Sequence, residues 1–285
     1  MVLLALVGAA VSFLIGFGVA GVIVALVISG GLAFVSYWKS DSVALAMSRA
    51  RPADPNQYRR LHNLVEGLCI AAGLPMPRIY VIDDEAPNAF ATGRNPQHAA
   101  VAVTTGLLEK MNRVGLEGVL AHELSHIKNY DILVSTLAVT MVGAIALLAD
   151  FAMRFMWWGG GRRNSRDRND NQNPVTIILF VLGFLLLILA PLIAQLMQFA
   201  VSRRRESLAD VSGVNLTRYP PGLISALEKL KDDTTVVHSA SRATAHLWIE
   251  QPTAQTPEEG RLSRLNRLFD THPPLEERIA ALREL

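Results

Sequence analysis

Three long stretches of the chain contain no charged residue: Val2–Trp38, Ile132–Ala149 and Pro174–Ser202. A helix of about 20 apolar residues is enough to cross the hydrocarbon core of a bilayer. As one helix, the first stretch would be about 56 Å long, well beyond a core of about 30 Å. We therefore expect a hairpin of two short spans there, with one long tilted helix as the alternative. Together the three stretches predict about four transmembrane helices.

The polar segments between these stretches predict how the chain is organised. Residues 1–38 would form the N-terminal hairpin, and residues 132–202 would form two apolar membrane segments joined by a polar loop at 159–173. Residues 39–131 and 203–285 would then be two halves of one polar domain on the same side of the membrane. Lys and Arg residues near the span ends are more numerous on that side, which predicts that the polar domain faces the cytoplasm.

The first half of the polar domain is predicted to contain both helices and strands. Asp54-Pro55 is typical of a helix start, and Gly73 is typical of the residue that ends a helix. Arg78–Ile82 contains residues that favour extended structure, and Ala99–Thr104 is a second predicted strand. We expect these two strands to form a small antiparallel sheet, with Asn88–Gly93 as the loop that they flank.

The second half of the polar domain is predicted to be mostly helical. A charge-dense helix would begin near Arg203, and further helices would cover Pro221–Lys231 and Pro274–Leu285. The expected fold class is a mainly α membrane protein that carries an α+β polar domain with a small sheet.

The stretch His122-Glu123-Leu124-Ser125-His126 has the pattern H-E-x-x-H. On a helix, residues four apart project from one face, so both imidazoles can bind one metal ion. Zinc held with an open coordination position activates a water molecule, and a glutamate beside it can take the proton from that water. Two surface histidines on an ordinary helix are the alternative. Asn112 can cap this helix, and its apolar stripe lies on a different face from the histidines.

Glu206 is the best candidate for a third ligand, because catalytic zinc sites usually take three from the protein. Asp210 follows on the same helical face, where it could accept a hydrogen bond from a ligand histidine. A solvated helix face beside Arg203–Arg205 is the alternative. Two apolar stretches separate His126 from Glu206. If both cross the membrane, the chain returns to the side that it left, and the two halves of the site can share one metal.

Composition supports a membrane protein and argues against a nucleic-acid partner. Of the 285 residues, 51% are hydrophobic and 18% are charged, which is more apolar than a soluble domain of this size needs. The formal net charge is +2, and the sequence contains neither a basic face nor a nucleic-acid-binding motif. The single cysteine, Cys69, cannot form an intramolecular disulfide, which is compatible with a reducing compartment.

Five separated motifs resemble the HtpX-type membrane zinc metalloproteases, which are relatives of the endopeptidases that process prenylated proteins. The motifs cover essentially the whole chain, in the order of that family. They read N-A-F-A-T-G from Asn88, H-E-L-S-H-I-K-N-Y-D from His122, R-R-R-E-S-L-A-D from Arg203, A-T-A-H-L-W-I from Ala243 and H-P-P-L-E-E-R-I from His272. The resemblance implies a zincin-like (gluzincin) catalytic domain in the cytoplasmic membrane.

The resemblance also implies roles for individual residues. One Zn²⁺ per chain would be bound by His122, His126 and Glu206, with Glu123 as general base and Asp210 orienting a ligand histidine. His272 would donate to the oxyanion of the tetrahedral intermediate. The substrate would be an extended polypeptide segment of a membrane protein or a damaged protein, bound along a sheet edge in a role of membrane-protein quality control. The cleft would be lined by strand Ala99–Thr104 and by Asn88, Ala89, Phe90, Ala91 and Thr92.

Two other classes of function are compatible with parts of the sequence. A di-iron membrane oxidase would use a Glu-x-x-His motif from each of two helices, but Glu123–His126 is the single match in the chain. A non-catalytic membrane scaffold clamped by a metal would have no use for Glu123, which does not bind the metal. We therefore expect a zinc-dependent endopeptidase.

Overall fold

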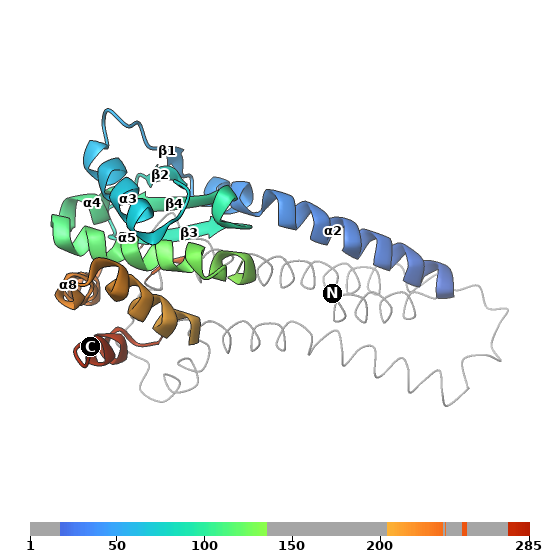
Figure 1. Cartoon of the computed structure of the whole chain (residues 1–285). Coiled ribbons are helices and arrows are strands. Elements are labelled where there is room, and N and C mark those ends of the chain that lie inside the picture. The colour runs from blue at the N-terminus through green and yellow to red at the C-terminus, as the bar shows by residue number, and fades with distance from the viewer. Residues whose placement is uncertain (1–17, 136–203, 236, 238–246, 250–272) are drawn as a thin grey trace. The chain divides into compact units, whose positions relative to one another are not determined.

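The computed structural model describes residues 18–135, 204–235, 237, 247–249 and 273–285 (Figure 1). The chain divides into two compact units, one of Met1–Tyr37 with Leu137–Met197 and one of Trp38–Thr136 with Gln198–Leu285. The polar loop predicted at 159–173 and nearly all of the two apolar segments predicted before and after it lie outside the described residues.

The first described element is α2 (Gly18–Met47), a helix of 30 residues. It begins inside the stretch predicted as a hairpin of two short spans, and it continues without a break past Trp38, the predicted end of that hairpin. Within the part of the chain that the structure describes, no helix is both long enough and apolar enough to cross a bilayer.

A four-stranded sheet, in the order β1-β2-β4-β3, is the centre of the second unit. Its strands are β1 (Arg51–Pro52), β2 (Arg78–Ile82), β3 (Ala89–Gly93) and β4 (Ala99–Thr104). β4 pairs in parallel with β2 and antiparallel with β3. The prediction of two antiparallel strands flanking a loop was therefore wrong: the supposed loop is the edge strand β3.

Strand β3 was missed because its sequence, Ala-Phe-Ala-Thr-Gly, is poor in residues that favour strands. Its extended form comes from tertiary contacts instead, because all five of its residues are buried. A short 3₁₀ turn, η1 (Pro96–His98), connects β3 to β4 and makes them an antiparallel pair. The chain reverses direction between β2 and β3 and again at η1, so β2 and β4 run in the same direction.

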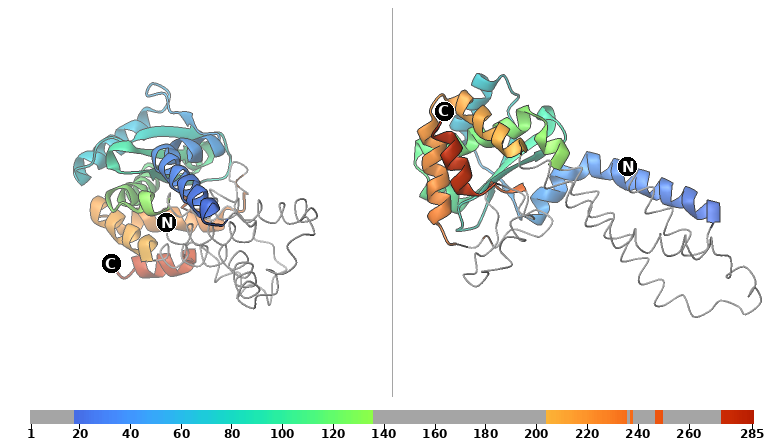
Figure 2. Two further views of the ribbon diagram at one scale, coloured as in Figure 1. Left: turned by 90° about the vertical axis from the view of Figure 1, so that its right-hand side faces the viewer. Right: turned by 90° about the horizontal axis from the view of Figure 1, so that it is seen from below.

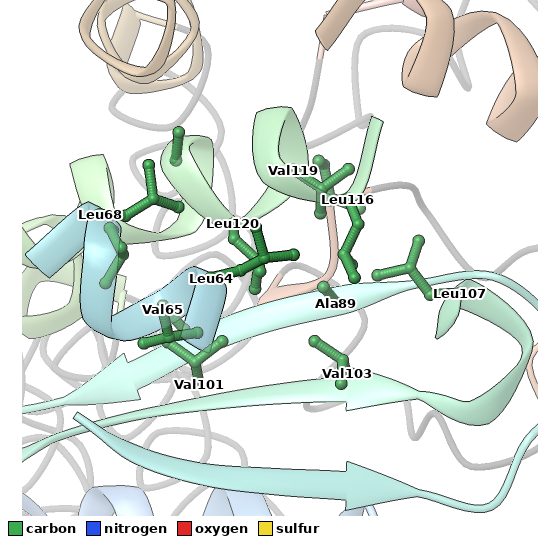
Figure 3. Close-up of a cluster of buried hydrophobic side chains, with 14 of the residues drawn as sticks. Leu64, Val65, Leu68, Ala89, Val101, Val103, Leu107, Leu116, Val119 and Leu120 are labelled. Carbon is green, nitrogen blue, oxygen red and sulfur yellow. The ribbon is translucent and has the colours of Figure 1, made fainter. Parts of the chain in front are cut away.

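Helices cover one face of this sheet and form the main core with it (Figure 3). They are α3 (Arg59–Ala72) and α5 (Arg113–Lys128), whose Leu64, Leu68 and Leu120 pack with Ala89, Val101 and Val103 of the strands. The other face is covered by Ala44 and Leu45 of α2 and by Trp248, whose ring packs edge-on against Phe90 at a centroid distance of 4.9 Å. β4 is buried along its whole length because both faces are covered.

The predicted start of α3 was wrong by one turn. Asp54 Oδ1 accepts a hydrogen bond from the backbone N–H of Asn56, which makes a local turn, and the helix begins only at Arg59. Its predicted end is correct: Gly73 has a φ of 67° and lies in the left-handed conformation that commonly ends helices. Cys69 of α3 is a buried free thiol, and burial raises its pKa to about 11.

The second half of the unit packs against α5 on the side away from the sheet (Figure 2). It contains a helix at residues 204–217, then α8 (Pro220–Asp232) and α10 (Leu275–Leu282). A Cβ atom on Gly118 of α5 would lie 2.7 Å from the backbone N of Leu223, so the missing side chain lets α8 approach closely. Helix α5 is thus enclosed between two layers, which explains why 11 of its 16 residues are buried.

Candidate metal centre

Helix α5 brings two imidazoles together at its buried C-terminal half. Asn112 caps the helix as predicted, because its Oδ1 accepts a hydrogen bond from the backbone N–H of Gly115 at 2.8 Å. One turn separates His122 from His126, and their Nε2 atoms lie 3.1 Å apart. His122 is completely buried, although the apolar stripe of α5 lies on another face, because the helix at 204–217 covers it.

Glu206 approaches these histidines from the helix at 204–217. Its Oε2 lies 3.5 Å from Nε2 of His122, and its Oε1 lies 3.4 Å from Nε2 of His126. Gly213, two turns further along the same helix, makes this approach possible. A Cβ atom there would lie 3.0 Å from the backbone N of His122.

The three side chains fit a single tetrahedral metal ion. Their ligand atoms all lie within 4.8 Å of one another. Zinc binds nitrogen and carboxylate oxygen at about 2.0–2.2 Å, so two ligand atoms on a tetrahedron are separated by about 3.3–3.6 Å. The two Nε2 atoms are 3.1 Å apart, and each lies 3.4–3.5 Å from a different oxygen of Glu206, so all three side chains can reach one ion.

A buried carboxylate and a buried arginine stand behind His122. Nδ1 of His122 faces Oδ1 of Asp210 at 2.9 Å. Arg278 of α10 donates to both oxygens of Asp210, from Nε at 2.9 Å and from Nη2 at 2.7 Å. Its Nη1 donates to the carbonyl of Ile249 at 3.2 Å and lies 3.6 Å from Oε2 of Glu206.

A second carboxylate stands behind His126. Nδ1 of His126 lies 3.0 Å from Oδ2 of Asp131, and the other oxygen of Asp131 accepts a short hydrogen bond from Arg205. Sequence reasoning assigned no role to Asp131, Arg205 or Arg278. Asp131 lies beyond the end of α5, so helical periodicity could not relate it to His126. The sequence feature that could have identified Asp131 is its place in the motif H-E-L-S-H-I-K-N-Y-D, nine residues after His122.

The electrostatics of the site favour positive charge at the histidines. Burial by itself lowers the pKa of His126, but Glu206 and Asp131 outweigh it and raise that pKa to about 10. Burial also lowers the pKa of His122, but Asp210 and Glu206 outweigh burial and raise that pKa. Burial raises the pKa of Asp210, but Arg278 and His122 lower it to about 2. Such a carboxylate-rich pocket suits a divalent cation.

Glu123 is buried beside these ligands, at 1% exposure. Its carboxylate is close enough to contribute to the raised pKa of His126. The position next to a ligand histidine, on the same helix, is the one that a proton acceptor for an attacking water would need. His272, the other predicted catalytic residue, lies outside the described residues.

Of the predicted cleft residues, Ala89–Thr92 belong to the edge strand β3, whereas Ala99–Thr104 is β4, which is buried between β2 and β3. Asn88 orients its Oδ1 toward the backbone N–H of Ala89 at 3.0 Å, and the carbonyl of Ala89 accepts from the N–H of Ile249 at 2.9 Å. Residues two apart in a strand direct their backbone groups to the same side. The outward-facing groups of β3 are therefore those of Ala89, Ala91 and Gly93, while Phe90 and Thr92 face β4.

Comparisons with known proteins place this geometry in context. The sequence model of Peptidase family M48 matches residues 55–285. A curated "Protease HtpX homolog" of Thermoanaerobacter pseudethanolicus is 48% identical over 252 residues, which is 88% of this chain and 80% of that protein. Another, of Limosilactobacillus reuteri, is 46% identical over 286 residues, which is 100% of this chain and 93% of that protein. The crystal structure of S. mikatae Ste24p is 20% identical with a TM-score of 0.49, covering 95% of this chain and 67% of that one.

Proposed function

Because the chain belongs to Peptidase family M48, we propose that it is a zinc-dependent endopeptidase of membranes. One observation carries the proposal: ligand atoms of His122, His126 and Glu206 converge within 4.8 Å of one another, with the carboxylate of Glu123 buried beside them. These three residues would hold a zinc ion, which when bound would supply Lewis-acid activation of a water molecule and of the substrate carbonyl. A metal-clamped scaffold would need the three ligands but would not need Glu123.

Other residues of the chain have the remaining roles in the proposed reaction. Asp210 and Asp131 accept hydrogen bonds from the Nδ1–H groups of the two histidines, which leaves Nε2 of each ring free to bind the metal. Glu123 accepts a proton from the attacking water and later delivers it to the leaving amine. His272 donates to the oxyanion that forms in between, a role that rests on the family resemblance.

The proposed substrate is an extended polypeptide bound along β3. An added strand would form hydrogen bonds with the outward-facing N–H and C=O of Ala91, and recognition through backbone groups tolerates many sequences. Loose specificity fits a role in clearing damaged or misassembled membrane proteins. The apolar stretches before and within the matched region support residence in the cytoplasmic membrane, and the distribution of basic residues supports a catalytic domain on the cytoplasmic side.

The Glu123→Gln variant of the full-length protein tests the proposal. Zinc content per chain, measured by elemental analysis, should remain at one, while the rate of peptide cleavage should fall by at least about 100-fold. Glu206→Ala serves as the matched control, because it should lose the zinc as well as the activity. Full cleavage by pure Glu123→Gln protein would rule out the general-base role, and unchanged zinc in Glu206→Ala would rule out the ligand set.

A di-iron oxidase receives no support from the described residues. Within that part of the chain, one group of three potential ligands is present, His122, His126 and Glu206, which suits one ion. Di-iron sites of helix bundles are built from four glutamates and two histidines. Elemental analysis distinguishes the two readings directly, because the oxidase would contain two irons per chain.

A further inference from the structure

Asp131 and Arg205 form a clasp beside the metal centre. Oδ2 of Asp131 lies 3.0 Å from Nδ1 of His126, and Oδ1 accepts from Nη1 of Arg205. The same Nη1 donates to the backbone carbonyl of Asn129 at 3.2 Å. The Asp131 side chain is 4% exposed and that of Arg205 is 39% exposed. One carboxylate thus connects a metal-ligating imidazole to a partly solvated guanidinium.

The backbone after α5 is bent in a way that brings Asp131 back to the helix. Asn129 ends α5, and Tyr130 has a φ of 60°. Non-glycine residues rarely adopt this left-handed conformation, and for an aromatic residue it is costly. A strained residue directly before Asp131 indicates that the surrounding contacts, including those of the clasp, hold this turn in place.

The clasp also connects two parts of the chain that are far apart in the sequence. Arg205 is the immediate neighbour of Glu206 in the helix at 204–217, so one helical turn supplies both a metal ligand and the partner of Asp131. Asp131 and Arg205 lie directly before and after residues 132–204. The ends of that long intervening segment are therefore joined by an ion pair whose carboxylate contacts a ligand of the metal.

We propose that Asp131 is a positioning residue for His126. Arg205 holds Asp131 and so joins the two ends of segment 132–204, which makes the affinity of the site for zinc depend on this ion pair. The inference rests on the proposed function, because it assumes that His126 binds the metal. Asp131 accepts a hydrogen bond from the Nδ1–H of His126 and so fixes the tautomer and the orientation of the ring. Arg205 occupies the second oxygen of Asp131 and prevents the carboxylate from turning away.

Zinc affinity and metal-free stability, measured separately, test this inference on the full-length protein. The zinc dissociation constant, from competition with a chromophoric chelator, should rise about 10- to 100-fold in Asp131→Ala. Asp131→Asn should have a smaller effect, because its amide oxygen still accepts a hydrogen bond but carries no charge. Arg205→Gln should weaken zinc binding about two- to fivefold, since water can partly replace a guanidinium that is 39% exposed. It should have no further effect in the Asp131→Ala background, since its influence acts through Asp131.

Lys110→Gln provides the matched control. Lys110 forms an ion pair of 2.6 Å with Asp233, also between distant parts of the sequence, but neither residue contacts a proposed ligand. This variant should leave the zinc dissociation constant unchanged. The visible spectrum of the Co²⁺-loaded protein adds a readout of ligand geometry. It should shift in the Asp131 variants, shift less in Arg205→Gln and stay unchanged in Lys110→Gln.

The possible outcomes separate the inference from the proposed function. If the wild type binds zinc and the Asp131 variants bind it equally well, the clasp is only structural and the inference is wrong. A loss of metal-free stability with an unchanged dissociation constant would lead to the same conclusion. If the wild type binds no zinc at all, both the inference and the proposed function are overturned.

Discussion

Arg278 holds Asp210 with two hydrogen bonds, from Nε at 2.9 Å and from Nη2 at 2.7 Å. Both side chains are buried, and the carboxylate of Asp210 faces His122. Arg278 belongs to α10 at the end of the chain, and its third nitrogen reaches the carbonyl of Ile249. The C-terminal helix therefore fixes the carboxylate that faces a candidate metal ligand, and at the same time it holds the segment that pairs with the edge strand β3.

Arg278→Met should destabilise the metal-free protein by about 3–5 kcal/mol, because it leaves Asp210 and Glu206 buried without their cation. Methionine keeps part of the side-chain length and removes the charge. Denaturant-induced unfolding of the metal-free protein measures the change in the free energy of unfolding.

Arg283→Met is the control for this variant, because Arg283 lies in the turn that ends α10 and pairs with Glu228 on the surface. Exposed pairs of this kind contribute at most about 1 kcal/mol. If both substitutions had the same small effect, Arg278 would not be needed to neutralise the buried carboxylates.

Gly213→Ala should disturb the metal centre although Gly213 bears no functional group. The added Cβ would lie 3.0 Å from the backbone N of His122, and backbone atoms cannot easily move aside. We expect a loss of about 1–3 kcal/mol in the free energy of unfolding, together with weaker zinc binding as Glu206 moves away from the histidines. Thermal unfolding and chelator competition measure the two effects.

Gly67→Ala is the matched substitution, because Gly67 lies on an exposed part of α3 and its Cβ would meet nothing within 4 Å. It should raise the free energy of unfolding by about 0.5–1 kcal/mol, since alanine favours the helix. A neutral or stabilising Gly213→Ala would show that the two helices can separate without cost.

The candidate ligands could be recognised in the sequence as pairs, because the members of each pair are related by local helical geometry. His122 and His126 share a face of one helix, and Glu206 and Asp210 share a face of another. The spacing of four residues encodes both relationships. The cap at Asn112 and the helix end at Gly73 were equally local and were predicted correctly.

What could not be predicted depends on contacts between distant segments. The edge strand β3 owes its extended form to pairing with β4 and to burial under Trp248, which its weak strand propensity does not reveal. Asp131 reaches His126 through a left-handed turn at Tyr130, and Arg278 reaches Asp210 from the last helix of the chain. No periodic pattern in the sequence connects these residues.

Substrate binding along β3 should depend on the backbone of the peptide. In an added strand, alternate N–H groups face the sheet edge, so N-methylation of a substrate should impair cleavage at every second position. We expect the effect to be mainly on KM, because the reacting bond is unchanged. Equal tolerance of N-methyl groups at all positions near the cleaved bond would contradict strand addition.

A variant at the edge strand complements the peptide series. Ala91→Pro removes the outward-facing N–H of β3 but leaves the ladder with β4, which uses Phe90 and Thr92. Its KM should rise while zinc content stays at one per chain. Glycine at position 91 is the control, because it keeps the N–H.

Zinc binding should strengthen as the pH rises from 6 to 9. Without metal, burial opposes charge on His126, but Glu206 and Asp131 outweigh it and raise the pKa to about 10, so the ring carries a proton that zinc must displace. The association constant should therefore rise by up to about tenfold per pH unit for each proton released. The raised pKa also stabilises the metal-free protein. That contribution is complete below the unfolded pKa of about 6.5, and it is lost as the pH rises through about 10.

The unfolding temperature with and without zinc, measured across this pH range, tests both statements. The metal-free protein should become less stable toward pH 9, and the stabilisation by added zinc should grow. Asp210 does not affect stability in this pH range. Its pKa is lowered to about 2, so the stability that it contributes is lost only below about pH 4. Glu206→Gln removes the carboxylate that most raises the pKa of His126, so its metal-free stability should vary less with pH. A wild-type zinc affinity that is constant between pH 6 and 8 would mean that the histidines bind the metal without releasing protons, which contradicts the charged, carboxylate-rich site described above.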